Sequence, residues 1–413
     1  MHITYRKKPM KKILGIIFVV LMALVGLNSC GDEAVDVNEV NQQTILIFLP
    51  WSGSDNSNGL YSEFETNLDS IEKGIIANKG LSNRRVLAFI SRPKESGYGY
   101  GKSYLYELQY NVTTRKMDYI QLDVFEGNSY NSAAGITQIL NEVKQKAEAL
   151  NYAMIIGAHG NGWTHANDWN SYPYNAPMRK LKTRYFGSVS SDGDAYKIEV
   201  STLAQGIEES GIKMQYIALD ACYMANVETA YELRNATNYM IASTSETLAT
   251  GWPYAKIWNF LSANVPNYSS IVSNYVSYFK NSNNPYGQLA AIDCRQMEGL
   301  ASVMKEINAK YQLDESKLED LQVLDGFRPR LYYDLGNYVN NLVPTGYLKE
   351  QFNNQLKKVV KSSGTTDLYI SDLYGAENTY PIQNFCGIAT SDPSMSPVAL
   401  RGREKTAWWQ ATH

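Results

Sequence analysis

The sequence has few of the residues that metal-dependent and nucleic-acid-binding proteins need. Its 413 residues include four histidines and four cysteines, without the CxxC pair or histidine cluster that binds structural zinc. The 38 Lys and Arg residues do not exceed the 41 Asp and Glu residues, so no basic excess is available for a nucleic-acid surface. A calcium loop of the DxDxDG type is also missing. We therefore expect no nucleic-acid partner and no required cofactor.

One long apolar run is present, at residues 13–27, where it follows a basic segment and ends in LNSC at Cys30. This pattern predicts a lipoprotein signal peptide at residues 1–29, whose removal leaves a lipidated Cys30 that attaches the protein to a membrane. The run is shorter than the roughly 20 residues of a spanning helix, which makes an uncleaved anchor the less favoured alternative. Asp32 and Glu33 after the cysteine favour the cell envelope of a Gram-negative bacterium, at the outer membrane or cell surface.

The remaining cysteines are Cys222, Cys294 and Cys386, an odd number that leaves at least one free thiol. A bridge between Cys294 and Cys386 is one possibility. Both residues lie in apolar, strand-like runs, LAAIDC and NFCGIAT, and we therefore favour buried free cysteines.

Apolar runs and amphipathic segments alternate along the chain, which predicts a three-layer α/β fold with a mostly parallel sheet. Strands are expected at 45–49, 85–90, 152–156, 215–220, 288–293, 369–374 and 385–390, with a hairpin at 104–123. Helices are expected at 60–75, 134–150, 203–211, 269–280, 296–311 and 347–362. We expect a tether at residues 30–43, a main domain at 44–260, and an α+β subdomain at 261–413 packed on the same sheet.

Two of the expected strands end in reactive residues. The run NYAMIIGAHGNGW delivers His159 to a glycine-rich loop, and the run MQYIALDAC delivers Asp220 and Cys222 to a second strand end. A helical pattern follows Cys222 at once, and the positive end of a helix would stabilise a thiolate there. Carboxyl ends of parallel strands share one edge of a sheet, so the sequence predicts that His159 and Cys222 meet.

The motifs AHGNGW and LDACYMANVE resemble the clostripain family of cysteine peptidases, relatives of caspases, gingipains and legumains. The segments ILIFLPWS, IASTSETLATGWPY, LYYDLGNYVNNL and NFCGIATSDP also agree, so the resemblance covers nearly the whole mature chain. It implies a caspase-like sandwich that acts on protein or peptide substrates as a monomer. Cys222 would be the nucleophile, His159 the general base and then acid, and the backbone N–H groups of Gly160 and Cys222 the oxyanion donors. No carboxylate is expected as a third member.

Asp220 is expected on the same face of its strand as Cys222, because side chains alternate with a period of two. The family resemblance implies that this carboxylate pairs with an Arg or Lys side chain at P1, and the alternative is a strand-end aspartate that binds loop amides. Relatives often carry another acidic residue where this chain has Ala249 and Thr250, which leaves open whether Glu246 substitutes for it. His165, in a polar loop, is a rival base that we expect at the surface.

The basic segment between the two motifs, at residues 164–191, is a candidate for proteolytic processing. Several relatives in the family cut themselves in the corresponding region, and the alternative here is a solvated loop. The candidate cleavage sites follow Arg179, Lys180, Lys182 and Arg184. Calcium dependence also occurs in the family. A different class of function stays open: a catalytically silent, glycan- or protein-binding lipoprotein of the same fold, which would use some of the 31 tyrosines.

Overall fold

The computed structural model describes residues 40–52, 59–92, 101–169, 198–373 and 378–413. The expected signal peptide, the lipidation site Cys30 and the candidate cleavage residues Arg179, Lys180, Lys182 and Arg184 lie outside the described residues. Within the described part of the chain, helices are too short or too polar to cross a bilayer.

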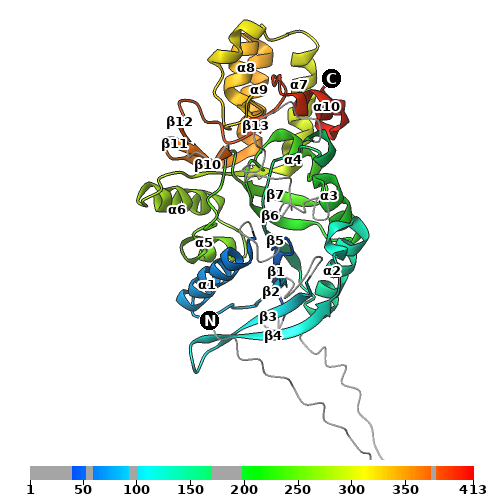
Figure 1. The fold of residues 1–413 in the computed structure, drawn as a ribbon, viewed down its shortest axis with the longest axis vertical. Coiled ribbons are helices and arrows are strands. Elements are labelled where there is room, and N and C mark those ends of the chain that lie inside the picture. Colours follow the sequence, from blue (N-terminus) through cyan, green and yellow to red (C-terminus); the bar gives the residue numbers. More distant parts are fainter. Residues whose placement is uncertain (1–39, 53–58, 93–100, 170–197, 374–377) are drawn as a thin grey trace, which may run out of the picture.

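Nine strands of the described chain form one mixed sheet in the order β10-β8-β7-β6-β5-β1-β2-β3-β4 (Figure 1). Its centre is parallel: β1 (Gln43–Leu49), β2 (Arg84–Ser91), β5 (Asn151–Gly157), β6 (Met214–Asp220) and β7 (Thr237–Ala242). Antiparallel strands extend both sides: β3 (Ser103–Asn111) and β4 (Lys116–Phe125), then β8 (Gln288–Asp293) and β10 (Val360–Thr365). The expected mostly parallel sheet is confirmed.

Helices cover both faces of the sheet and complete three layers (Figure 1). One face packs against α1 (Tyr61–Ala77), α5 (Tyr254–Leu261) and α6 (Tyr268–Lys280). The other packs against α2 (Ala133–Lys146), α3 (Val200–Glu209), α4 (Val227–Glu232), α7 (Met297–Asn308), α9 (Tyr347–Val359) and α11 (Ala407–Thr412). Strand β6 shows the period of two that produces this arrangement. Ile217 and Leu219 pack on the face covered by α2, α3 and α4, whereas Tyr216 and Ala218 pack on the face covered by α1, α5 and α6.

The C-terminal part of the chain adds short elements at one end of the sheet (Figure 1). These are α8 (Leu335–Leu342), α10 (Pro397–Gly402) and two small antiparallel pairs: β9 (Tyr333–Asp334) with β13 (Ala389–Thr390), and β11 (Leu368–Ser371) with β12 (Asn378–Pro381). A third apolar cluster joins this region to Trp163 and Tyr223, which follow β5 and β6. Strands β8 and β10 belong to the main sheet, and the division of the chain at residue 260 stays a prediction.

Several expected elements differ from the observed ones: the helix expected at 134–150 ends at Lys146, the helix expected at 296–311 ends at Asn308, and the strand expected at 369–374 ends at Ser371. The helix expected to reach residue 362 ends at Val359, and the chain continues directly into β10, where it pairs with β8. The strand expected at 385–390 is limited to Ala389–Thr390. The helix expected directly after Cys222 begins only at Val227, because the intervening residues form a turn that Asn226 ends as a helix cap.

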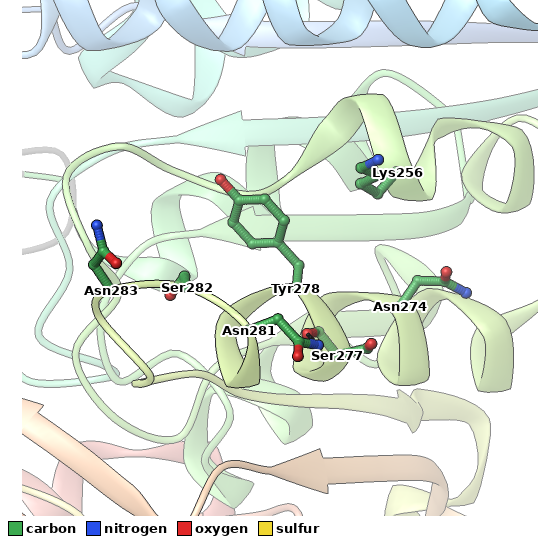
Figure 2. A pocket seen from close by; sticks show the side chains of 7 residues that line it. All are labelled: Lys256, Asn274, Ser277, Tyr278, Asn281, Ser282 and Asn283. Atoms are coloured by element: carbon green, nitrogen blue, oxygen red, sulfur yellow. Dashed lines mark hydrogen bonds between the residues drawn. The ribbon is translucent and has the colours of Figure 1, made fainter.

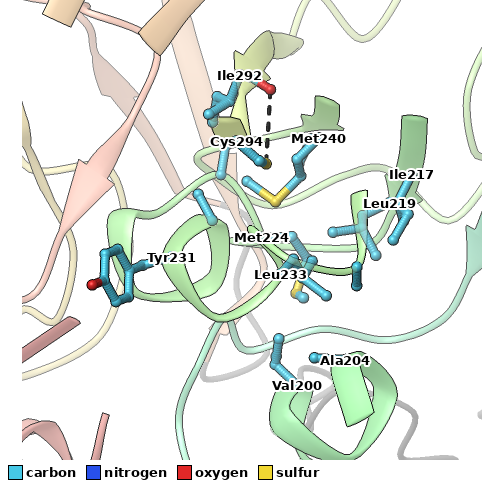
Figure 3. Close-up of a cluster of buried hydrophobic side chains, with 14 of the residues drawn as sticks. Val200, Ala204, Ile217, Leu219, Met224, Tyr231, Leu233, Met240, Ile292 and Cys294 are labelled. Carbon is cyan, nitrogen blue, oxygen red and sulfur yellow. Dashed lines mark hydrogen bonds between the residues drawn. The ribbon is translucent and has the colours of Figure 1, made fainter. Parts of the chain in front are cut away.

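The cysteines of the described chain are free, as expected, and Cys294 is buried, whereas Cys386 is only half-buried. Cys294 is buried between α4 and the sheet, among apolar side chains that include Met240, Met224 and Leu233 (Figure 3). Its Sγ lies 3.9 Å from the carbonyl oxygen of Ile292. Burial raises the pKa of this thiol to about 12, so Cys294 is a neutral packing residue.

Candidate active site

The loop that carries His159 leaves the sheet beside the end of β6. Gly157 pairs with Asp220 in the parallel register, and the N–H of Ala158 donates to the carbonyl oxygen of Asp220 at 3.3 Å. The segment that leaves β5 therefore stays beside β6 for one residue beyond the end of β5. His159 follows immediately and its side chain is half-buried.

Gly160 lies directly against the backbone of Cys222. A Cβ atom at position 160 would come within 2.5 Å of the carbonyl oxygen of Cys222 and 3.0 Å of its nitrogen. Only glycine permits this approach, since real Cβ atoms do not come so close to backbone atoms. The structure thus brings His159, Gly160 and Cys222 to one edge of the sheet, where the two expected oxyanion donors are neighbours.

The thiol of Cys222 is half-buried and bound to one residue of a neighbouring loop. The N–H of Thr247 donates to Sγ at 3.3 Å, and the S–H faces the carbonyl oxygen of Thr247 at 3.7 Å. Burial, and after it the negative charge of Glu246, raises the pKa of the thiol to about 12. The thiolate expected at a helix N-terminus is therefore wrong for the resting protein, because α4 begins too far along the chain.

Tyr223, next to Cys222, fixes the turn between β6 and α4. Its φ of 62° lies in the left-handed region, which is uncommon for a residue with a side chain. Its N–H donates to the carbonyl oxygen of Ser245 at 3.0 Å, and its hydroxyl donates to Glu246 Oε1 at 2.6 Å. Glu246 Oε2 accepts the N–H of Asp372 at 3.0 Å, and burial raises the pKa of this carboxyl. Glu246 thus has a structural role in supporting the turn.

The Asp220 side chain is 7% exposed and faces α5. Its Oδ2 accepts hydrogen bonds from the N–H of Trp252 at 3.0 Å and the hydroxyl of Tyr254 at 2.9 Å. Burial raises the pKa of Asp220 to about 7, although both hydrogen bonds act in the opposite direction. The bond to Trp252 is the loop-amide contact that the alternative interpretation expected. Both bonds use the same oxygen.

His165, expected at the surface, is instead half-buried. Its Nδ1 lies 3.1 Å from Glu199 Oε2, and its ring packs edge-on against Trp163 at 5.9 Å. The other oxygen of Glu199 accepts the N–H of Ala166 at 3.1 Å. Because Glu199 follows the segment 170–197 and His165 precedes it, these contacts join the two ends of that segment. We therefore assign His165 a structural role, in the contact between the two ends of this segment.

Three further residues around the site received no role from the sequence, although each lies in a segment that resembles the family. Thr247 contacts the sulfur through its backbone, so its side chain gives no indication of the role. Tyr223 and Tyr332 stack beside the site, with ring centroids 5.7 Å apart. Tyr332 lies in the segment LYYDLGNYVNNL, whose resemblance to the family is the signal that could have found it.

A cavity of about 620 Å³ lies elsewhere, on α5, α6 and the loop that follows (Figure 2). Its lining is polar and includes Lys256, Tyr278 and Asn281 but neither His159 nor Cys222. The amide of Asn281 is bound to its own helix, where it donates to Ser277 O at 2.7 Å. Among the described residues, no three His, Cys, Asp or Glu side chains are grouped to hold a metal ion. Calcium dependence stays untested.

Comparison with known proteins gives a consistent result. The model of the clostripain family matches residues 112–379. A secreted C11 cysteine protease from Bacteroides thetaiotaomicron is 36% identical, with a TM-score of 0.80 over 91% of this chain and 99% of that one. A clostripain from the same organism, in complex with the peptide inhibitor BTN-VLTK-AOMK, is 40% identical over 55% of this chain and 99% of that one, with a TM-score of 0.52.

A more distant structure has a similar fold. An inactive zymogen C11 protease from Parabacteroides distasonis is 22% identical over 90% of this chain and 98% of that one, with a TM-score of 0.73. A search among curated proteins found no match.

Proposed function

Because the chain belongs to the clostripain family of cysteine peptidases and has its caspase-like fold, we propose that it is an endopeptidase that uses a Cys222–His159 dyad. The observation that carries this proposal is the contact of Gly160 with the Cys222 backbone, which brings the histidine loop to the nucleophile. The family implies protein or peptide substrates, and the 36% identical relative is described as secreted. Attachment through a lipid on Cys30 and action as a monomer are parts of the same proposal.

The resting thiol is neutral, so catalysis begins with a proton transfer. His159 accepts the proton of Cys222 as the sulfur attacks the carbonyl carbon of the scissile bond. The N–H groups of Gly160 and Cys222 donate to the oxyanion of the tetrahedral intermediate. His159 then protonates the leaving amine, and an acyl-enzyme remains on Cys222. A water molecule, deprotonated by His159, hydrolyses this thioester and restores the thiol.

We propose Asp220 as the residue that selects Arg or Lys at P1. An aspartate whose pKa is raised to about 7 ionises near neutral pH, and a cationic side chain that enters the site would favour the charged form. The inhibitor bound to the 40% identical relative supports this selectivity, because its peptide letters end in K, the code for lysine. The small residues Ala249 and Thr250 leave Asp220 without the second carboxylate that relatives often carry.

Self-cleavage after Arg179, Lys180, Lys182 or Arg184 is the remaining part of the proposal. The contact of His165 with Glu199 supports it, because it holds the two ends of the segment together whether or not the chain between them is intact. Intact mass of the purified protein after incubation tests this step. A Cys222→Ala variant, which cannot cut itself, is the control.

The experiment that tests the main proposal compares fluorogenic peptides with Arg, Lys, Asp or Ala at P1. Turnover of the Arg and Lys peptides that both Cys222→Ala and His159→Ala abolish supports the dyad. Equal turnover of all four peptides would remove the role of Asp220. Silence on every peptide, with no labelling of Cys222 by an Arg chloromethyl ketone, would instead support the binding lipoprotein.

A further inference from the structure

Tyr332, from the C-terminal part of the chain, connects the loops that carry His159 and Cys222. Its side chain is fully buried, and its hydroxyl donates to the carbonyl oxygen of Asn161 at 2.6 Å. The N–H of Trp163 also bonds to this hydroxyl. Two backbone groups of the histidine loop are therefore held by one phenol.

The same ring contacts the other loop. Tyr332 stacks on Tyr223 with an angle of 21° between the ring planes, and Tyr223 is the residue after Cys222. Gly162 completes the contact, because a Cβ there would lie 2.1 Å from the Tyr332 hydroxyl and 2.7 Å from Asn226 Nδ2. Asn226 in turn donates to the carbonyl oxygen of Tyr223 at 2.7 Å. The two loops and Tyr332 thus form one interlocked group without space for an added methyl group.

We propose that Tyr332 is a positioning residue that sets the distance and orientation between His159 and Cys222. This inference rests on the proposed function, since it assigns a role in the same acyl-transfer step. Strand pairing of β5 with β6 fixes the two loops only as far as Ala158, and the residues beyond it need another support. Proton transfer and attack require a fixed geometry, so a small displacement of the histidine loop reduces the rate without removing the substrate site.

The test replaces Tyr332 by Phe, which keeps the ring on Tyr223 and removes the hydroxyl. Tyr369→Phe is a matched control, because Tyr369 is also buried in the C-terminal part and its hydroxyl donates to the carbonyl oxygen of Asp325 at 2.9 Å. For Tyr332→Phe we expect kcat to fall about tenfold with KM unchanged, and alkylation of Cys222 by iodoacetamide to slow about fivefold. The control should keep both rates within about twofold of the wild type, with a similar change in Tm.

An unchanged kcat and alkylation rate in Tyr332→Phe would overturn the inference. So would equal losses in both variants that follow the fall in Tm, because they would indicate a general effect of stability. If the wild-type protein turns over no peptide, the proposed function fails. The alkylation rates of the two variants then decide the role of Tyr332 separately.

Discussion

The ends of β6 and β8 carry the same two residue types and differ in what surrounds them. Strand β6 ends at Asp220, with Cys222 two residues on, and β8 ends at Asp293, followed by Cys294. Since β6 runs parallel to β7 and β8 runs antiparallel to it, the two ends lie at opposite edges of the sheet. Burial raises the pKa of both thiols to about 12, so resting acidity does not distinguish the nucleophile from the packing residue.

The neighbours make the distinction. Asp293 is bound by Arg295, whose Nη2 and Nε lie 2.7 and 2.8 Å from its carboxylate oxygens, and Cys294 is covered by apolar side chains. Asp220 is instead bound by a tyrosine hydroxyl and one backbone N–H, and Cys222 is half-buried beside the glycine of the histidine loop. An aspartate followed closely by a cysteine at a strand end is therefore not in itself a sign of a site.

The largest difference should come from replacing each cysteine. Cys222→Ala should reduce turnover of an Arg peptide by at least about a thousandfold, because the nucleophile is lost. Cys294→Ala should leave kcat unchanged and lower the free energy of unfolding by about 1 kcal/mol, because it removes only a buried sulfur. Steady-state kinetics and urea unfolding measure the two effects. Comparable kinetic losses in both variants would contradict the comparison.

Replacing His159 should make the β6 edge chemically similar to the β8 edge. His159→Ala should lower kcat by about a hundredfold to ten-thousandfold, because no base then accepts the thiol proton. His165→Ala is the control: it breaks the contact with Glu199 and should keep kcat within about threefold. Measuring kcat and KM of both variants at neutral pH tests these two expectations. A larger loss in the His165 variant would assign the base to that residue.

The two aspartates should separate specificity from stability. Asp220→Asn should lower the preference for Arg over Ala at P1 by about tenfold to a hundredfold, because the charge that pairs with the substrate is gone. Asp293→Asn should leave this preference unchanged and cost about 1 to 2 kcal/mol of stability through the weakened bonds to Arg295. Paired peptide assays and unfolding curves check these outcomes. An unaltered preference in Asp220→Asn would remove Asp220 from the P1 site.

The last comparison concerns the pH dependence of stability. Burial raises the pKa of Asp220 from 3.8 to about 7, so between these values the folded protein keeps a proton that the unfolded chain has lost. The contribution of Asp220 to the free energy of unfolding therefore falls as the pH rises from about 4 to about 7. The Asn variant should lack this fall. Over the same range, the preference of the wild type for Arg over Ala should increase as Asp220 ionises. Identical pH profiles for the wild type and the Asn variant would contradict this assignment.

Local patterns predicted much of the fold and of the site. The apolar run QLAAID gave β8 with its observed bounds, and the two motif strands ended within one residue of the expected positions, because period and turn residues are encoded within a few positions. The predicted start of α4, directly after Cys222, was wrong. The apolar pattern continues through residues 223–227 in the sequence, but the left-handed turn at Tyr223 delays the helix until after its cap, Asn226. The contact of Tyr332 with Asn161 joins residues 171 positions apart, and no local pattern indicates it.

The pairing of β5 with β6 also decides what a break between residues 169 and 198 would produce. The two strands lie at the centre of the sheet and would then belong to different polypeptides, each with half of the buried surface between them. The two fragments would share both cores of such a cut protein, because the apolar clusters on the two faces of the sheet contain side chains from before residue 169 and from after residue 198. Separating the fragments would require unfolding them, so the nicked protein should elute as one particle at any dilution that leaves it folded.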